Sequence, residues 1–217
     1  MSQVKFGAIV LGIASLTMMG VMLVHPSHID QAPVLGPFGF SGVVHAFAIL
    51  AHVAFLYGAW SLSRYQGFDR ATPGLALAFA GLAAVAMVNA AMISMFVVPF
   101  AAGHAMPGTV DPHNAAAQGV HVWVAANRGF AQIYVALQSI AIAIWALAWR
   151  GNAMRAAGLI AGLGVLAWQL TGWFQPSVHT MPIVMIVQGA WLIAAASIMF
   201  RSADQSAEPS ASKEYQA

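Results

Sequence analysis

Residues 73–100 read PGLALAFAGLAAVAMVNAAMISMFVVPF, a run without a charged side chain. A helix needs about 20 consecutive apolar residues to cross the hydrocarbon core of a bilayer, and this run is long enough. Leucine, alanine and methionine dominate it, and apolar residues do not alternate with polar ones as they would in a barrel strand. The run therefore predicts a transmembrane α-helix.

Five further apolar runs complete the pattern. One ends at Trp149 and begins between residues 118 and 130, and the others cover about residues 6–24, 38–62, 156–174 and 182–200. The first run lacks a small-residue cleavage pattern at its end, so we expect it to stay as an anchor. We therefore expect an all-α membrane protein, with a bundle of six transmembrane helices over residues 1–200 and a disordered tail over 201–217.

The composition excludes several other classes of protein. Of 217 residues, 60% are hydrophobic and 6% are charged, whereas a soluble domain carries about a quarter charged residues. The absence of cysteine excludes disulfide scaffolds, zinc–thiolate sites and iron–sulfur clusters. A formal net charge of +2 is too small to indicate a nucleic-acid partner. The expected partners are the lipid bilayer and either another membrane protein or a second copy of the chain.

The basic residues predict the orientation of the bundle, because Lys and Arg beside membrane helices are retained on the cytoplasmic side. All of the eight except Arg128 precede the first run, follow the sixth, or lie between runs two and three or four and five. Segments 25–37, 101–117 and 175–181 contain neither Lys nor Arg. We therefore expect both termini in the cytoplasm, and the alanine-rich composition points to a bacterial inner membrane.

Histidines gather on the side opposite the basic residues. His45 and His52 lie in the second run and are seven residues apart, so they share one helix face about 10 Å apart along its axis. They cannot both bind one metal ion, and each needs a partner from another helix. The simpler interpretation is that each one forms a structural hydrogen bond. Histidines at the ends of runs or between them are expected to be solvated or to cap helices, namely His25, His28, His104, His113 and His179.

Methionines show the same bias, in pairs that share one helical face because they are three or four residues apart. The pairs are Met18 and Met22, Met92 and Met95, and Met181 and Met185. Their simplest role is packing, since methionine fills irregular gaps well. Their thioethers could also bind a soft metal ion.

Polar residues inside the runs are costly in hydrocarbon and indicate an internal site. On the fourth run His121, Arg128, Gln132 and Ser139 advance by seven, four and seven residues, which predicts one polar stripe facing protein or water. Asn89, Gln169 and Gln188 are polar residues of other runs. Arg128 has no carboxylate in any run, which leaves Asp30, Asp111, backbone carbonyls or an anionic ligand as its partner. If the fourth run begins at residue 130, Arg128 instead reaches the membrane surface.

These features favour a metal or haem site in the extracytoplasmic half of the bundle. The candidate metal ligands are His45, His52, His121, Met18, Met22, Met92 and Met95. Imidazoles and thioethers together favour copper. Haem b is the other candidate, with Arg128 neutralising a propionate and Gln132 and Asn89 in the same cofactor site.

Two further hypotheses use the same residues. A small-solute or proton-coupled transporter would bind an anionic group at Arg128, although the chain shows no internal repeat of the kind common in transporters. An accessory membrane subunit would use the polar stripe only to pack against a partner. No nucleotide-binding loop, zinc-protease motif or serine-hydrolase motif is present in the sequence, so enzymatic activity stays undecided.

Overall fold

The computed structural model of the chain describes residues 1–25, 39–68, 70–98, 100, 115–175, 177 and 179–205. These residues form helices joined by short turns, and they contain no strand. The helices are α1 (Gln3–Leu23), α2 (Phe40–Tyr65), α3 (Ala71–Met92), α5 (Ala115–Ala148), α6 (Asn152–Leu159), α7 (Val165–Leu170) and α8 (Thr180–Gln205). Within the described part, six helices are long and apolar enough to cross a membrane, which confirms the predicted all-α fold and number of candidate spans.

Several helix boundaries differ from those predicted. α3 continues as the π-helix η2 (Ile93–Val97), and the π-helix η3 (Ile160–Gly164) joins α6 to α7 in one span. α5 has 34 residues and begins at Ala115, so Arg128 lies well inside a continuous helix. α8 ends at Gln205, so the first residues of the predicted tail, 201–205, are helical, and residues 206–217 lie outside the described part.

Local sequence explains where these helices begin and end. The Ser2 side chain accepts a hydrogen bond from the backbone N–H of Lys5 and caps α1. Pro73 lies in the first turn of α3, where a missing N–H costs little. Gly67 follows α2 with φ of 95°, and Gly172 follows α7 with φ of 75°. Glycine adopts this left-handed conformation readily, and so both helices stop there.

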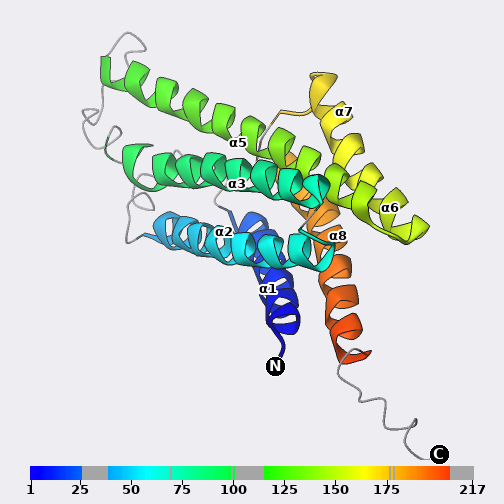
Figure 1. The fold of residues 1–217 in the computed structure, drawn as a ribbon. Helices are drawn as coiled ribbons and strands as arrows, with labels where there is room; N and C mark the ends of the chain where they lie inside the picture. The colour runs from blue at the N-terminus through cyan, green and yellow to red at the C-terminus, as the bar shows by residue number, and fades with distance from the viewer. Residues whose placement is uncertain are drawn as a thin grey trace, which may run out of the picture.

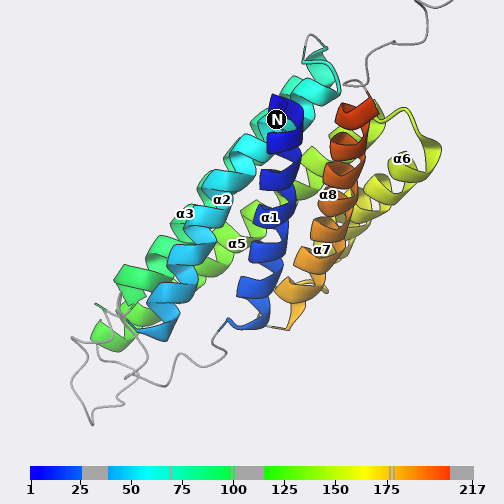
Figure 2. The same cartoon turned by 90° about the horizontal axis from the view of Figure 1, so that it is seen from below.

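Neighbouring helices pack in antiparallel pairs around the bundle. α1 lies between α8 and α2, α3 lies between α2 and α5, and the α6–α7 span packs on α5 (Figures 1 and 2). We call the end at which α1, α3 and α6 begin the basic end, because it carries the described Lys and Arg residues other than Arg128. The opposite end, where α1 finishes and α2 begins, is called the histidine end.

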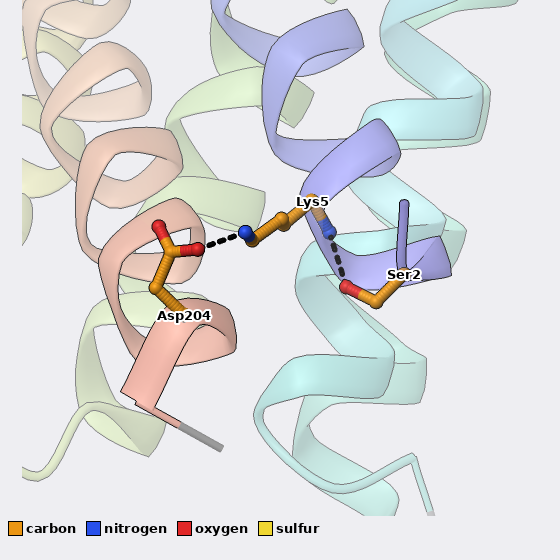
Figure 3. Close-up of polar contacts among 3 residues, drawn as sticks. All are labelled: Ser2, Lys5 and Asp204. Carbon is orange, nitrogen blue, oxygen red and sulfur yellow. Dashed lines mark hydrogen bonds and ion pairs between the residues drawn. The ribbon is translucent and has the colours of Figure 1, made fainter. Parts of the chain in front are cut away.

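The two terminal helices are joined at the basic end. Lys5 forms an ion pair with Asp204 of α8, as Figure 3 shows. The Tyr65 and Ser202 hydroxyls are 3.0 Å apart and link α2 to α8. These contacts place the start of α1 and the end of α8 side by side (Figure 2).

The surface of the bundle is apolar along its flanks. Large apolar side chains are exposed on every span, among them Ile13, Leu50, Leu82, Ile133, Ile160 and Ile183. Several polar side chains are instead buried, among them His45, His52, Gln138 and Gln188. Soluble proteins rarely expose such continuous apolar surface, whereas a bilayer covers it at no cost. This distribution is the one that a membrane-embedded bundle requires.

The interior consists of two packed clusters. One lies toward the basic end around Trp145, which is fully buried among residues of α1, α2, α5 and α8. The other lies toward the histidine end and contains Tyr134, Phe174, Met181 and Met185, with Met22 packed against it. Met19 and Met22 connect this second cluster to the last turns of α1, the helix that His25 follows.

Candidate functional site

Two histidines meet at the histidine end of the bundle. His25 follows the last turn of α1, and His45 lies in the second turn of α2. Their Nε2 atoms are 3.2 Å apart, and the two rings meet at 79° with centroids 5.0 Å apart. His45 is buried, with 5% of its surface exposed. The antiparallel packing of α1 on α2 therefore creates an imidazole pair from two separate segments.

Backbone hydrogen bonding fixes which nitrogen of His45 carries a proton. Its Nδ1 lies 2.6 Å from the carbonyl oxygen of Ser41, one turn earlier on α2. A carbonyl can only accept, so Nδ1 is the protonated atom that donates. The neutral ring then has its lone pair on Nε2, which faces His25. In the pair, the Nε2–H of His25 donates to the Nε2 of His45.

His52 repeats this arrangement two turns deeper. Its Nδ1 donates to the carbonyl oxygen of Ala48 at 2.7 Å, which leaves the lone pair on Nε2. Its ring meets the ring of Tyr134 on α5 at 75°, with centroids 5.5 Å apart. The Tyr134 hydroxyl donates to the sulfur of Met185 at 3.4 Å. His52 thus contacts Tyr134 of α5, which in turn contacts Met185 of α8.

The α1–α2 contact has a regular antiparallel register. An added Cβ at Gly7 would strike Ser61, and one at Gly58 would strike Leu11. His25 meets His45 farther along the same pair of helices. In an antiparallel pair, residues at the same level along the axes have a nearly constant sum of residue numbers. This sum is 68, 69 and 70 at the three contacts, so Met18 and His52, whose numbers also sum to 70, lie level. Met18 is also buried, with 5% of its surface exposed.

Other predicted site residues are exposed or half-buried, although Asn89 lines a shallow pocket between α2 and α3 that is also lined by His52. Asn89, Met92, His121, Arg128 and Gln132 are exposed, and Met95 is half-buried. The amide of Asn89 donates to the carbonyl oxygen of Val85 on its own helix. The structure therefore does not assemble the single shared pocket that the sequence predicts. The transport hypothesis needed the exposed residues and the buried histidines in one cavity.

The polar stripe on α5 is buried only at its inner end. Ser139 is fully buried, and its hydroxyl accepts a hydrogen bond of 2.9 Å from the amide of Gln188 on α8. The 34 residues of α5 span about 50 Å, which exceeds the roughly 30 Å of a bilayer core. His121 and Arg128 are exposed, but Asn127 beside Arg128 donates to the hydroxyl of Ser94 on η2, so Arg128 lies on the outward face of a packed part of α5. A strict seven-residue spacing also drifts by about 20° per step around a straight helix.

The sequence pattern did not predict the contact of His25 with His45 or the buried group around Met185. His25 was predicted to be solvated or to cap a helix, but it contacts His45. A signal for this pair exists, because His25 ends one span and His45 begins the next, and antiparallel neighbours bring such positions level. The buried group of Tyr134, Met87, Met181 and Met185 gives no comparable signal, because its members come from three helices.

No group of three or more His, Asp or Glu residues close enough to hold a metal ion occurs within the described ranges. His28, His104, His113, Asp30 and Asp111 lie outside those ranges. His179 lies at the start of α8, exposed, with its backbone N–H bonded to Ser177. The described histidine contact is therefore a pair of imidazoles from α2 and the residue after α1.

Comparison with known proteins identifies no relative: no family model matches the chain, and no match is found among curated proteins or solved structures.

Proposed function

We propose that this protein binds a copper ion through His25 and His45 at the histidine end of its helical bundle. The observation that carries the proposal is the 3.2 Å separation of their Nε2 atoms, with the proton of His45 held on the opposite nitrogen. Histidine ligands usually donate their other ring N–H to a carbonyl or carboxylate, which orients the ring and raises its basicity. The hydrogen bond from His45 to Ser41 supplies that support.

The spacing of the pair suits two ligands of one ion. With metal–nitrogen bonds of about 2.0–2.1 Å, adjacent corners of a tetrahedron are about 3.3–3.4 Å apart. The observed separation needs to widen by only about 0.2 Å to reach this value. Binding needs a lone pair on both Nε2 atoms, so His25 must change to the neutral tautomer that carries its proton on Nδ1. A small movement therefore converts the hydrogen-bonded pair into a ligand pair.

The surroundings favour copper over zinc and over haem. Met22 lies in the last turn of α1 and packs against the methionine-containing cluster toward the histidine end, so thioethers are present in this part of the bundle. Imidazole and thioether together suit copper, and among divalent first-row metals copper binds nitrogen ligands most strongly. Two axial imidazoles of a haem would lie about 4 Å apart with the macrocycle between them, given bonds of about 2.0 Å. A separation of 3.2 Å leaves no room for that macrocycle.

We further propose that the basic end faces the cytoplasm of a bacterium and that the histidine pair faces the opposite compartment. The described Lys and Arg residues other than Arg128 lie at the basic end, and such residues stay on the cytoplasmic side of inner-membrane proteins. The apolar flanks of the bundle support its insertion in the bilayer. The copper site would then face an extracytoplasmic compartment.

This orientation predicts the labelling of single cysteines, which the natural chain lacks. Asn152 is exposed at the basic end and Gln175 is exposed near the histidine end, between α7 and α8. In intact spheroplasts a membrane-impermeant maleimide should label Gln175→Cys, but it should label Asn152→Cys only after lysis. The reverse pattern would show that the bundle is inserted the other way.

Copper binding is tested by titrating the purified protein in nanodiscs with Cu(I) under anaerobic conditions. A coloured chelator competes for the ion, and its absorbance reports the affinity of the protein. We expect about one copper per chain. His25→Ala and His45→Ala should each weaken binding about 100-fold, because each removes one of the two nitrogen ligands, a larger loss than removing a supporting partner. Unfolding temperatures measured on the same samples show whether each variant is folded.

His121→Ala is the matched control for this titration. His121 is exposed on α5, outside the pair, and its loss should leave the stoichiometry and affinity unchanged. Copper binding that persists at full affinity in folded His45→Ala would contradict the site. An equal loss in His121→Ala would show that copper binds exposed histidines without selection.

A further inference from the structure

Arg128 is the one Lys or Arg residue of the described part that lies away from the basic end. It is exposed on α5, while its neighbour Asn127 donates to the hydroxyl of Ser94 on η2. Asp204 is the one carboxylate side chain within the described ranges, and it pairs with Lys5 at the basic end. The guanidinium of Arg128 therefore lies outside the helix packing, without an acidic partner in the described part of the chain.

The helix registers give the depth of this guanidinium. The hydrogen bond from Asn127 to Ser94 fixes the register of α5 against α3, with residue numbers that sum to 221. The hydrogen bond from Ser63 to Pro73 fixes the register of α2 against α3, with residue numbers that sum to 136. Both pairs of helices are antiparallel, so Asn127 is level with Gly42 in the first turn of α2.

This level corresponds to the phospholipid head groups. The segment of α2 from Gly42 to Tyr65 rises about 35 Å, slightly more than the roughly 30 Å of a bilayer core. A bundle whose basic end lies at one surface of the bilayer therefore carries Arg128 into the head groups of the other leaflet. Gln132 is exposed four residues later on the same face of α5, about 6 Å deeper. Its amide lies where the glycerol esters of a lipid begin.

We propose that this face of α5 binds an anionic phospholipid, with the phosphate on the guanidinium of Arg128 and an ester carbonyl on the side-chain amide of Gln132. A guanidinium pairs with phosphate through two parallel hydrogen bonds, and an amide N–H donates to a carbonyl. The two side chains follow each other along the membrane normal in the same order as the phosphate and the esters of a lipid. The site rests on the proposed insertion of the bundle in a bilayer, in either direction, and requires neither histidine of the copper pair.

Lipid preference beside this face can be measured with a fluorophore on a single cysteine, because the natural chain has none. Leu170 is suited to the label: it is 78% exposed on α7, and the amide of its neighbour Gln169 donates to the carbonyl oxygen of Gln132 at 2.9 Å. Phosphatidylglycerol and phosphatidylcholine that carry a nitroxide near the ester quench the fluorophore when they bind beside it. In phosphatidylcholine nanodiscs containing Leu170→Cys, phosphatidylglycerol should bind about fivefold more tightly, as expected for one basic residue.

Phe47→Cys is the matched control for position. Phe47 is 55% exposed on α2, and the same registers make it level with Gln132. The two lipids should quench a fluorophore there equally. In the Leu170→Cys protein, Arg128→Gln should abolish the preference for phosphatidylglycerol. Arg128→Lys should keep part of it, because lysine retains the charge but not the paired donors.

Two further comparisons separate a lipid site from surface charge and from free phosphate. Combining Arg128→Gln with Gln118→Arg keeps the net charge but moves the cation about 15 Å along α5, so it should not restore the preference. Inorganic phosphate in excess should not relieve quenching by phosphatidylglycerol. An unlabelled diether phosphatidylglycerol, which lacks ester carbonyls, should compete about threefold less well than the diester, and equally well in Gln132→Leu.

Equal quenching by the two lipids at Leu170→Cys, or a preference that survives in Arg128→Gln, would overturn the proposal. Restoration of the preference by Gln118→Arg would overturn it by showing that net charge is sufficient. Relief of quenching by inorganic phosphate would overturn it in favour of an anion site without lipid specificity. Arg128→Gln should still bind copper, and His45→Ala should keep the lipid preference. The lipid site and the copper site can therefore fail independently.

Discussion

Gly58→Ala is expected to destabilise the bundle by about 2–3 kcal/mol, because one added carbon overpacks the contact between α1 and α2. A Cβ on Gly58 would lie 2.7 Å from the Cα of Leu11 and 2.9 Å from its backbone nitrogen. These atoms belong to the main chain of α1, so they cannot turn aside as a flexible side chain would. The two helices would have to separate, and the register that brings His25 to His45 depends on their contact.

The unfolding free energy in a detergent–denaturant titration measures this effect. Gly81→Ala is the matched control, because Gly81 lies within α3 and an added Cβ would meet nothing within 4 Å. That variant should be neutral or slightly stabilised, since alanine is the better helix former. Leu11→Ala should not rescue Gly58→Ala, because the backbone of residue 11 remains. Equal stability of Gly58→Ala and Gly81→Ala would contradict the close approach of the helices.

Trp145→Ala is expected to cost about 3–5 kcal/mol, the usual range for removing a fully buried aromatic side chain. Trp145 has no exposed surface, and its indole nitrogen donates to the hydroxyl of Ser63 at 2.9 Å. That hydroxyl donates in turn to the carbonyl oxygen of Pro73 at 3.0 Å. One side chain of α5 is thereby tied to α2 and to the first turn of α3. The variant loses this link and leaves a large cavity at the basic end.

The same unfolding titration applies, with Trp173→Ala as the control. Trp173 is 85% exposed, so its replacement should change the stability by no more than about 0.5 kcal/mol. Trp145→Phe should fall between the two, because it keeps most of the buried ring but removes the donor to Ser63. If Trp145→Ala and Trp173→Ala lower the unfolding free energy by the same amount, the burial of Trp145 in the core is contradicted.

The sequence alone was enough to predict the helices. An uncharged run of about 20 residues can satisfy its backbone in hydrocarbon only as a helix, so the spans depend on local composition. The basic residues beside the helix ends also form a local pattern, and the structure places the described ones other than Arg128 at one end of the bundle. The length of α5 was harder to predict, because Ala115–Gly129 contains polar residues that are tolerated where a helix leaves the bundle.

The candidate site was predicted only in part, because it depends on contacts between distant segments. Periodicity identified His45 and His52 as two residues on one face, and both are buried. It could not identify His25 as the partner of His45, since that requires the register of α1 against α2. It also placed Arg128 and Ser139 on one stripe, whereas Arg128 is exposed and Ser139 is buried against Gln188 of α8.

X-ray absorption spectroscopy of the copper-loaded protein tests the histidine pair most directly. Two imidazole ligands at about 2.0 Å should account for the nitrogen scattering of the natural chain, and folded His25→Ala and His45→Ala should each lose one of them. His121→Ala should give the spectrum of the natural chain. A copper spectrum without imidazole scattering, or one that is the same in all four proteins, would contradict a site built from His25 and His45.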